Sequence, residues 1–210
     1  MNTDYENGSF FMRWFGKLAD VLLLTLLWVV CSLPLLTIGA ATIALYDAIA
    51  RCVHGNHEGP YKYFFHVLKK ELLRGILITL VWAALAFGLY VGYAYLYQWG
   101  KTSSLAAAYS LVYLGTILVP VGVFAWLIPL EARFRYGFFG LHKAAATFTI
   151  VHLPTTGILL GIAAVAVVIA VFVPAMALLL PGIVMTLQSW FVEKVFKNYI
   201  VQEDQNDTAE

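Results

Sequence analysis

The chain has 210 residues, of which 61% are hydrophobic and 12% are charged, and its formal net charge is +1. That charged fraction is about half of what a soluble globular domain carries. A single soluble core cannot enclose so much apolar surface, whereas a lipid bilayer can solvate it. The small net charge also excludes a globally basic protein that binds nucleic acid.

Four long stretches of the sequence contain no Asp, Glu, Lys or Arg. They cover residues 21–46, 75–100, 102–130 and 144–192. A helix needs about 20 apolar residues to cross the hydrocarbon core, so each stretch is long enough for at least one membrane span. We therefore predict an all-α protein, a polytopic transmembrane helical bundle with short amphipathic helices at the membrane interface.

The first stretch allows two arrangements of residues 21–50. They can form one long span kinked at Pro34, or two short helices joined by a turn at this proline. Pro34 lacks a backbone donor and disfavours helix in the residue before it, and Thr37 is suited to cap a second helix. Because the turn also places more of the basic residues on the cytoplasmic side, we favour six membrane helices over five.

The other boundaries follow from the distribution of Lys and Arg, which are enriched in the cytoplasmic loops of membrane proteins. Basic residues concentrate in segments 51–74 and 131–153 and near the C-terminus. By contrast, segment 99–104 contains one basic residue and segment 174–182 contains none. We therefore expect both termini to be cytoplasmic. Residues 1–200 are expected to form a single domain, followed by a disordered polar tail over 201–210. The expected spans are 18–33, 38–52, 75–98, 104–130, 155–174 and 181–198.

Two segments outside the expected spans are amphipathic. In residues 61–72, aromatic and aliphatic residues recur on one helical face, while Lys62, His66 and Lys69 occupy the others. Residues 138–151 show a similar pattern. Both segments are expected to lie along the headgroup region and to lead into the next span.

Charged residues at the ends of the expected spans form the candidate polar site. Asp20 lies near Lys17 in sequence and Asp47 lies near Arg51, at spacings where opposite charges meet on a helix. A membrane-embedded acid is a candidate proton or cation site, although local pairing at a helix end is the more common reason for one. An arginine at a helix exit can fasten helix ends or bind lipid phosphate, which we favour over a transporter gate or docking surface. The candidate residues are Asp20, Asp47, Arg51, Glu131, Arg133 and Arg135.

The sequence predicts no metal ligands, no cofactor and no catalytic residues. His54 and His57 have a spacing found among metal ligands, but they lie in a loop and no set of four ligands accompanies them. There is no phosphate-binding loop, no Gly-x-Ser-x-Gly elbow and no His-Glu-x-x-His motif. We therefore expect a protein that is not an enzyme, with free thiols at Cys31 and Cys52.

Residues 28–41 contain a motif, WVVCSLPLLTIGAA. It resembles the signature of the YesL-like family of small bacterial integral membrane proteins, and the similarity covers about residues 8–200. The family has no established activity, so the resemblance implies no catalytic residues. Its genes in Gram-positive bacteria often accompany sugar-uptake and polysaccharide-degradation systems, which implies an accessory role around carbohydrate import. The resemblance also implies a location in the bacterial cytoplasmic membrane. The motif residues are Trp28, Cys31, Pro34, Thr37 and Gly39.

Three classes of function are compatible with the sequence. The first is a non-enzymatic accessory or regulatory membrane protein associated with carbohydrate uptake, in contact with lipids and with a sugar permease or its ATPase subunit. The second is a small stand-alone transporter or channel, expected to be a homo-oligomer, in which helices broken by prolines line a solute site. The third, an intramembrane enzyme, is least favoured because no paired carboxylates are evident. The prolines in question are Pro34, Pro120, Pro129 and Pro174.

Overall fold

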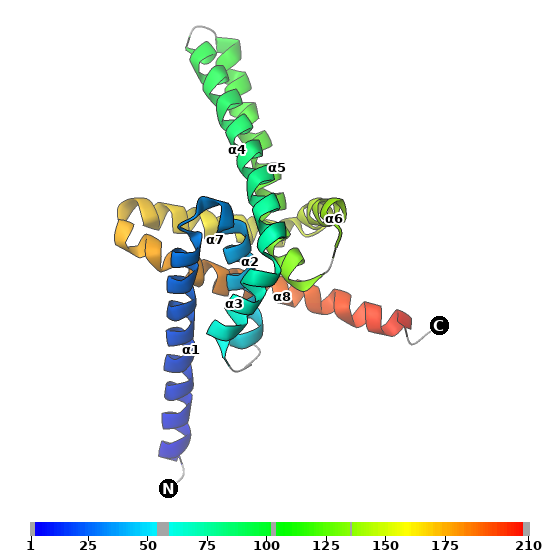
Figure 1. Ribbon diagram of the computed structural model, residues 1–210. Helices are drawn as coiled ribbons and strands as arrows, with labels where there is room; N and C mark the ends of the chain where they lie inside the picture. The colour runs from blue at the N-terminus through cyan, green and yellow to red at the C-terminus, as the bar shows by residue number, and fades with distance from the viewer. Residues whose placement is uncertain (1–2, 54–58, 102–103, 135, 208–210) are drawn as a thin grey trace.

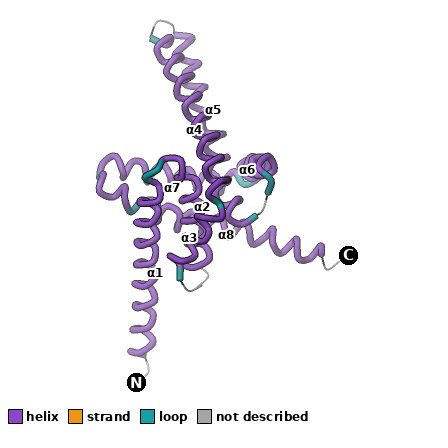
Figure 2. Tube along the Cα trace, in the orientation of Figure 1, coloured by secondary structure: helices purple, strands orange, loops and turns teal. Residues whose placement is uncertain are grey.

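The computed structural model describes residues 3–53, 59–101, 104–134 and 136–207. Within these ranges the chain is helical and contains no strand, which confirms the predicted all-α class (Figure 2). The helices are α1 (Thr3–Ser32), α2 (Ile38–Ala48), α3 (Pro60–Lys70), α4 (Leu72–Gly100), α5 (Ser104–Arg133), α6 (Phe138–Val151), α7 (Leu153–Phe172) and α8 (Leu180–Asp207).

Five segments of the described chain are long and apolar enough to cross a membrane, as a multi-pass protein requires. The sixth expected span, 181–198, is not among them. Glu193, Lys194 and Lys197 all fall within any part of α8 that is long enough to cross a membrane, and three charges there are more than a span of that length contains elsewhere in the chain. The five segments are Phe15–Ser32, Leu35–Val53, Leu72–Gly100, Ala108–Arg133 and Leu153–Phe172.

The chain turns at Pro34, so the predicted pair of helices is present and the single kinked span is wrong. Helix α1 ends at Ser32, a short 3-10 turn follows over Leu35–Thr37, and α2 then runs back beside α1 (Figure 1). The hydroxyl of Thr37 donates to the carbonyls of Cys31 and Pro34, at 2.5 and 2.7 Å. Thr37 therefore closes the turn, and the expectation that its side chain caps α2 is wrong.

Helix α2 lies at the centre of the molecule. Every residue from Gly39 to Ala48 is buried, and the helix contacts α1, α3, α4, α5 and α8. A helix that is apolar all round is suited to such an enclosed position.

A close backbone approach in the core joins α2 to α4. A Cβ atom added to Gly75 would lie 2.3 Å from the backbone nitrogen of Ala40, and one added to Gly39 would lie 2.5 Å from the carbonyl oxygen of Gly75. The hydroxyl of Thr79 accepts the backbone N–H of Gly39 at 2.9 Å and donates to the carbonyl of Gly75 at 2.8 Å. Small residues at such crossings let membrane helices pack closely.

Two helical hairpins extend from this centre. Helices α4 and α5 project together well beyond α2, whereas α7 and α8 run crosswise to them (Figure 1). Large apolar side chains on these hairpins are exposed, among them Phe87, Leu111 and Val171. Such surface is stable only against lipid or against another membrane helix.

Two expectations about helix continuity need correction. Helix α5 runs unbroken through Pro120 and Pro129, since neighbouring helices in a membrane protein can accommodate a proline. Only Pro34 and Pro174, the latter opening a 3-10 turn, mark departures from α-helix. Helix α8 continues to Asp207, into residues for which we expected no regular structure.

Candidate functional site

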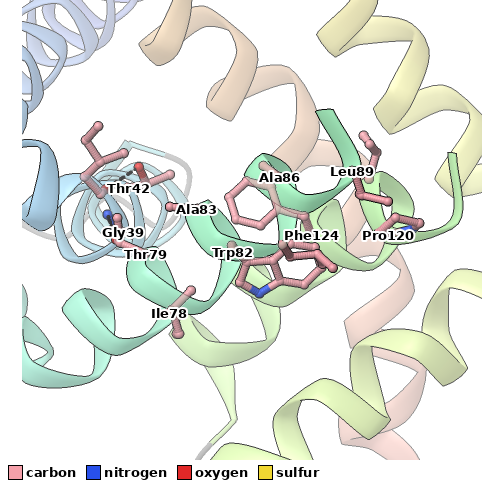
Figure 3. Close-up of a pocket in the computed structure, with 13 residues that line it drawn as sticks. Gly39, Thr42, Ile78, Thr79, Trp82, Ala83, Ala86, Leu89, Pro120 and Phe124 are labelled. Atoms are coloured by element: carbon pink, nitrogen blue, oxygen red, sulfur yellow. Dashed lines mark hydrogen bonds between the residues drawn. The ribbon is translucent and has the colours of Figure 1, made fainter. Parts of the chain in front are cut away.

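Two hollows border α2, and they differ in chemistry. The first, which we call the apolar groove, has a volume of about 340 Å³ and lies between α2, α4 and α5 (Figure 3). The second, which we call the charged cavity, has a volume of about 500 Å³ and lies near the other end of α2, where α3, α4 and α5 also meet. The charged cavity is lined by Ile43, Asp47, Arg51, Tyr63, His66, Val67, Lys70, Glu71, Arg74, Glu131, Ala132, Arg133 and Phe134.

Asp47 is buried at one wall of the charged cavity. Its Oδ1 accepts from Nε of Arg51 at 2.6 Å, so the pair predicted from their spacing is present. Its Oδ2 accepts from the hydroxyl of Tyr63 on α3 at 2.9 Å. Burial, and after it the negative charge of Asp47, raises the pKa of Tyr63 to about 12. The phenol is therefore held as a proton donor to Asp47 throughout the physiological range.

Arg133 fastens the end of α5 to α8. Its Nε and Nη2 donate to the two carboxylate oxygens of Glu193 at 2.8 and 2.6 Å, in a bidentate pair. The hydroxyl of Tyr46, on α2, donates to the same carboxylate at 3.3 Å. Arg133 thus contacts a neighbouring helix through a carboxylate, and not through the backbone carbonyls or lipid phosphate considered for it; Glu193 and Tyr46 were not predicted. In the sequence, Glu193 is marked by its position alone, as the first charged residue after the uncharged stretch 144–192.

Glu131 lies deeper than the other charged residues of the cavity, and no part of its side chain is exposed. Nη1 of Arg74 is 2.8 Å from its Oε1, but this contact lacks hydrogen-bond geometry. Among the described residues, neither carboxylate oxygen of Glu131 accepts a hydrogen bond. Arg74 instead donates through Nη2 to the carbonyl of Tyr136. The sequence pointed to Glu131 but not to Arg74, because their helices meet only in the folded chain.

The structure does not bring every predicted residue into the cavity. Asp20 is half-buried on α1 and forms no ion pair with Lys17, so that expected pair is wrong. Arg135 lies outside the described residues, as do His54 and His57. Within the described ranges, no three His, Cys, Asp or Glu side chains are grouped so as to hold a metal ion.

The family-like motif builds the α1–α2 hairpin rather than the cavity. The indole Nε1 of Trp28 donates to the hydroxyl of Thr42 at 3.1 Å, which ties α1 to α2. The carbonyl of Cys31 accepts from Thr37 in the turn, and Gly39 makes the close contact with α4. Cys31 and Cys52 are both free thiols, as expected. These residues position the site without lining the charged cavity.

The apolar groove contains almost no polar surface. The hydroxyls of Thr42 and Thr79 are turned to backbone carbonyls of their own helices. Trp82 and Phe124 lie against each other on α4 and α5, with ring centroids 5.1 Å apart (Figure 3). The buried Nε1 of Trp82 has no partner among the described residues. The groove is suited to hydrocarbon, whereas charged side chains line the charged cavity.

Residues 21–93 match a family model described as "Protein of unknown function, DUF624". The matched segment runs from within α1 into α4, and so includes the hairpin, all of α2 and the contact between Gly39 and Gly75. No curated protein and no solved structure matches the chain. The comparison thus relates this part of the chain to a family whose activity is unknown.

Proposed function

We propose that the protein is a non-enzymatic accessory component of a carbohydrate-uptake system in the bacterial cytoplasmic membrane, with both termini in the cytoplasm. The resemblance of residues 28–41 to the YesL-like signature supports the association with sugar uptake. The charge distribution supports the orientation, because the basic loops are those that contain α3 and α6.

The observation that carries this proposal is the surface of α3. Phe64 and Val67 are buried, and Tyr63 bonds to Asp47 of α2, so one face of the helix is fixed to the core. The opposite face exposes the aromatic rings of Tyr61 and Phe65. Lys62 and Lys69 are exposed beside these rings. A rigid face with aromatic anchors and positive charge, outside the candidate spans, is suited to docking a permease or its ATPase subunit.

Purification of the tagged protein from native membranes in mild detergent, followed by mass spectrometry, tests this proposal. A stoichiometric permease or ATPase subunit should accompany the wild type. Replacing both Tyr61 and Phe65 by Ser should lower its yield at least about tenfold, because aromatic anchors carry much of the free energy of an interface. The matched control replaces Phe87 and Tyr90, two exposed aromatic residues on α4. Equal recovery with both double variants would contradict docking through α3.

A second candidate function, a small oligomeric transporter, is favoured by the charged cavity. Buried carboxylates beside a polar hollow at the ends of membrane helices are features of solute and ion pathways. Flux of a sugar or ion in proteoliposomes, abolished by Asp47→Asn, would support this function. Asp20→Asn is the control because Asp20 does not line the cavity. Absence of flux with every solute tested would favour the accessory role.

A further inference from the structure

The cations and the carboxylates that line the charged cavity differ in how far they are enclosed. Three ion pairs join residues of the lining, and in each of them the carboxylate is much less exposed than its cationic partner. The fourth lining cation, Arg133, is paired with Glu193, which does not line the cavity. A molecule that enters the cavity therefore meets the cations before the carboxylates. The exposed fractions of the side chains are 38% for Arg51 and 6% for Asp47, 49% for Lys70 and 14% for Glu71, and 38% for Arg74 and 0% for Glu131.

Two of these exposed cations have hydrogen-bond donors to spare. Among the described residues, the hydrogen bond of Arg51 uses Nε alone, which leaves both Nη groups of its guanidinium to donate. Lys70 carries three N–H groups, and its ion pair, at 3.4 Å, involves a single carboxylate oxygen. Both Nη groups of Arg74 already have partners on the protein, so this residue contributes mainly its charge. An anion can thus be bound without breaking the ion pairs.

The free donors are suited to a phosphate group. A guanidinium matches phosphate oxygens through parallel N–H groups, and an ammonium can donate to a further oxygen as a compact charge. The volume of the cavity, about 500 Å³, lies within the range of small-molecule sites. The cavity therefore has room for a phosphate together with the group that the phosphate esterifies.

The position of the cavity indicates where such a ligand would come from. Arg51 lies at the end of one candidate span, Arg74 lies near the start of the next, and Arg133 lies at the end of a third. The ends of membrane spans meet the headgroup layer, which presents phosphate at high local concentration, and basic pockets between spans bind anionic headgroups. The exposed rings of Tyr61 and Phe65 on the adjacent α3 are typical of the same layer.

We propose that the charged cavity binds the phosphate group of an anionic phospholipid. The phosphate accepts from the Nη groups of Arg51 and from Lys70, and the charge of Arg74 strengthens its attraction. A choline headgroup joins the phosphate to a quaternary ammonium, which the exposed cations repel. A soluble phosphate ester shares the phosphate chemistry but lacks the acyl chains that hold a lipid in the bilayer. This binding site does not depend on the docking role of α3.

Native mass spectrometry of the purified full-length protein tests the preference for an anionic headgroup. The probes are phosphatidic acid, phosphatidylglycerol and phosphatidylcholine with identical acyl chains. Retention of each anionic lipid should exceed that of phosphatidylcholine by at least about tenfold, since hydrogen bonds between charged groups are strong. Equal retention of the three lipids would overturn the proposal without the need for any variant.

Variants then locate the site. Arg51→Lys keeps a positive charge beside Asp47 but has no guanidinium, and together with Lys70→Gln it should lower retention of phosphatidic acid at least about tenfold. Lys70→Gln alone changes a half-exposed side chain, so it should preserve the fold and still lower retention about threefold. Lys69→Gln is the matched control, because it removes the same charge from an exposed lysine of α3 that does not line the cavity.

The variants overturn the site if retention is undiminished in Lys70→Gln and in the double variant, or if Lys69→Gln lowers it as much as Lys70→Gln does. Competition with inorganic phosphate and with glycerol 3-phosphate identifies the source of the ligand. Failure of both to displace phosphatidic acid, even in large excess, supports a membrane source. Displacement by either at the concentration of the lipid itself overturns the assignment to a lipid.

Discussion

The apolar groove and the charged cavity share α2, but the helices around them are held together by different forces. At the groove, Gly39 and Gly75 bring two backbones into contact and Thr79 joins them by hydrogen bonds. At the cavity, the helices are joined through charged side chains that reach across from neighbouring elements, as Arg133 does to Glu193. Close packing therefore determines the geometry at one end of α2, and electrostatics determines it at the other.

The largest expected effect of a single substitution is at the groove end. Gly75→Ala places a Cβ atom 2.3 Å from the backbone nitrogen of Ala40, which cannot move without displacing α2. Overpacking of this kind costs about 3 kcal/mol. The melting temperature in detergent should fall sharply, together with the yield of monodisperse protein. Gly88→Ala on the same helix meets nothing within 4 Å and should leave stability unchanged or slightly higher.

The cavity end should be less sensitive because its groups are partly solvated. Among the described residues, Arg133→Met leaves the carboxylate of Glu193 with only the hydroxyl of Tyr46, and should cost about 2 kcal/mol. Thermal unfolding in detergent measures this loss. Lys70→Met, which removes a half-exposed ion pair at 3.4 Å, should cost less than about 1 kcal/mol. Similar losses for the two variants would show that the bidentate pair does not join α5 to α8.

A smaller effect is expected from the hydrogen bonds of Thr79. Thr79→Val preserves the shape of the side chain but leaves the backbone N–H of Gly39 without its acceptor, a loss of about 1 kcal/mol. Thr116→Val is the matched control, since this exposed hydroxyl bonds only to the carbonyl of Val112 in its own helix. Hydrogen exchange at the start of α2 should also become faster in Thr79→Val. Unchanged exchange there would argue against this contact as an anchor of α2.

The last effect is confined to alkaline pH and concerns the pH dependence of stability. Folded Tyr63 holds its proton to about pH 12, whereas an unfolded tyrosine loses it near pH 10. Between these values the unfolded chain binds fewer protons, so this residue makes stability fall as pH rises from about 10 to 12. Tyr63→Phe should show a shallower fall in melting temperature over that window. Tyr61→Phe, on the exposed face of α3, is the control for loss of a hydroxyl. If the melting temperature of Tyr63→Phe falls as steeply over this window as that of the wild type, the link to Asp47 is refuted.

Features that depend on local sequence were predictable. The turn at Pro34 follows from the missing backbone donor, and the pair of Asp47 with Arg51 follows from their spacing on one helix. The same reasoning failed for Lys17 and Asp20, because a suitable spacing allows a pair but does not require one. It also failed for the prolines within α5, because packing around a helix in a membrane can satisfy the backbone groups that a proline leaves free.

The sequence alone determined that this is a helical membrane protein, because long uncharged apolar stretches are stable only as helices in lipid. It also located Asp47, Glu131 and Arg133 at the ends of those helices. Only the tertiary structure decided that α2 is enclosed, that Glu193 pairs with Arg133, and that Arg74 reaches Glu131. Helices that are apolar on every side carry no periodicity to show which faces meet, so contacts between residues distant in sequence follow only from the packing.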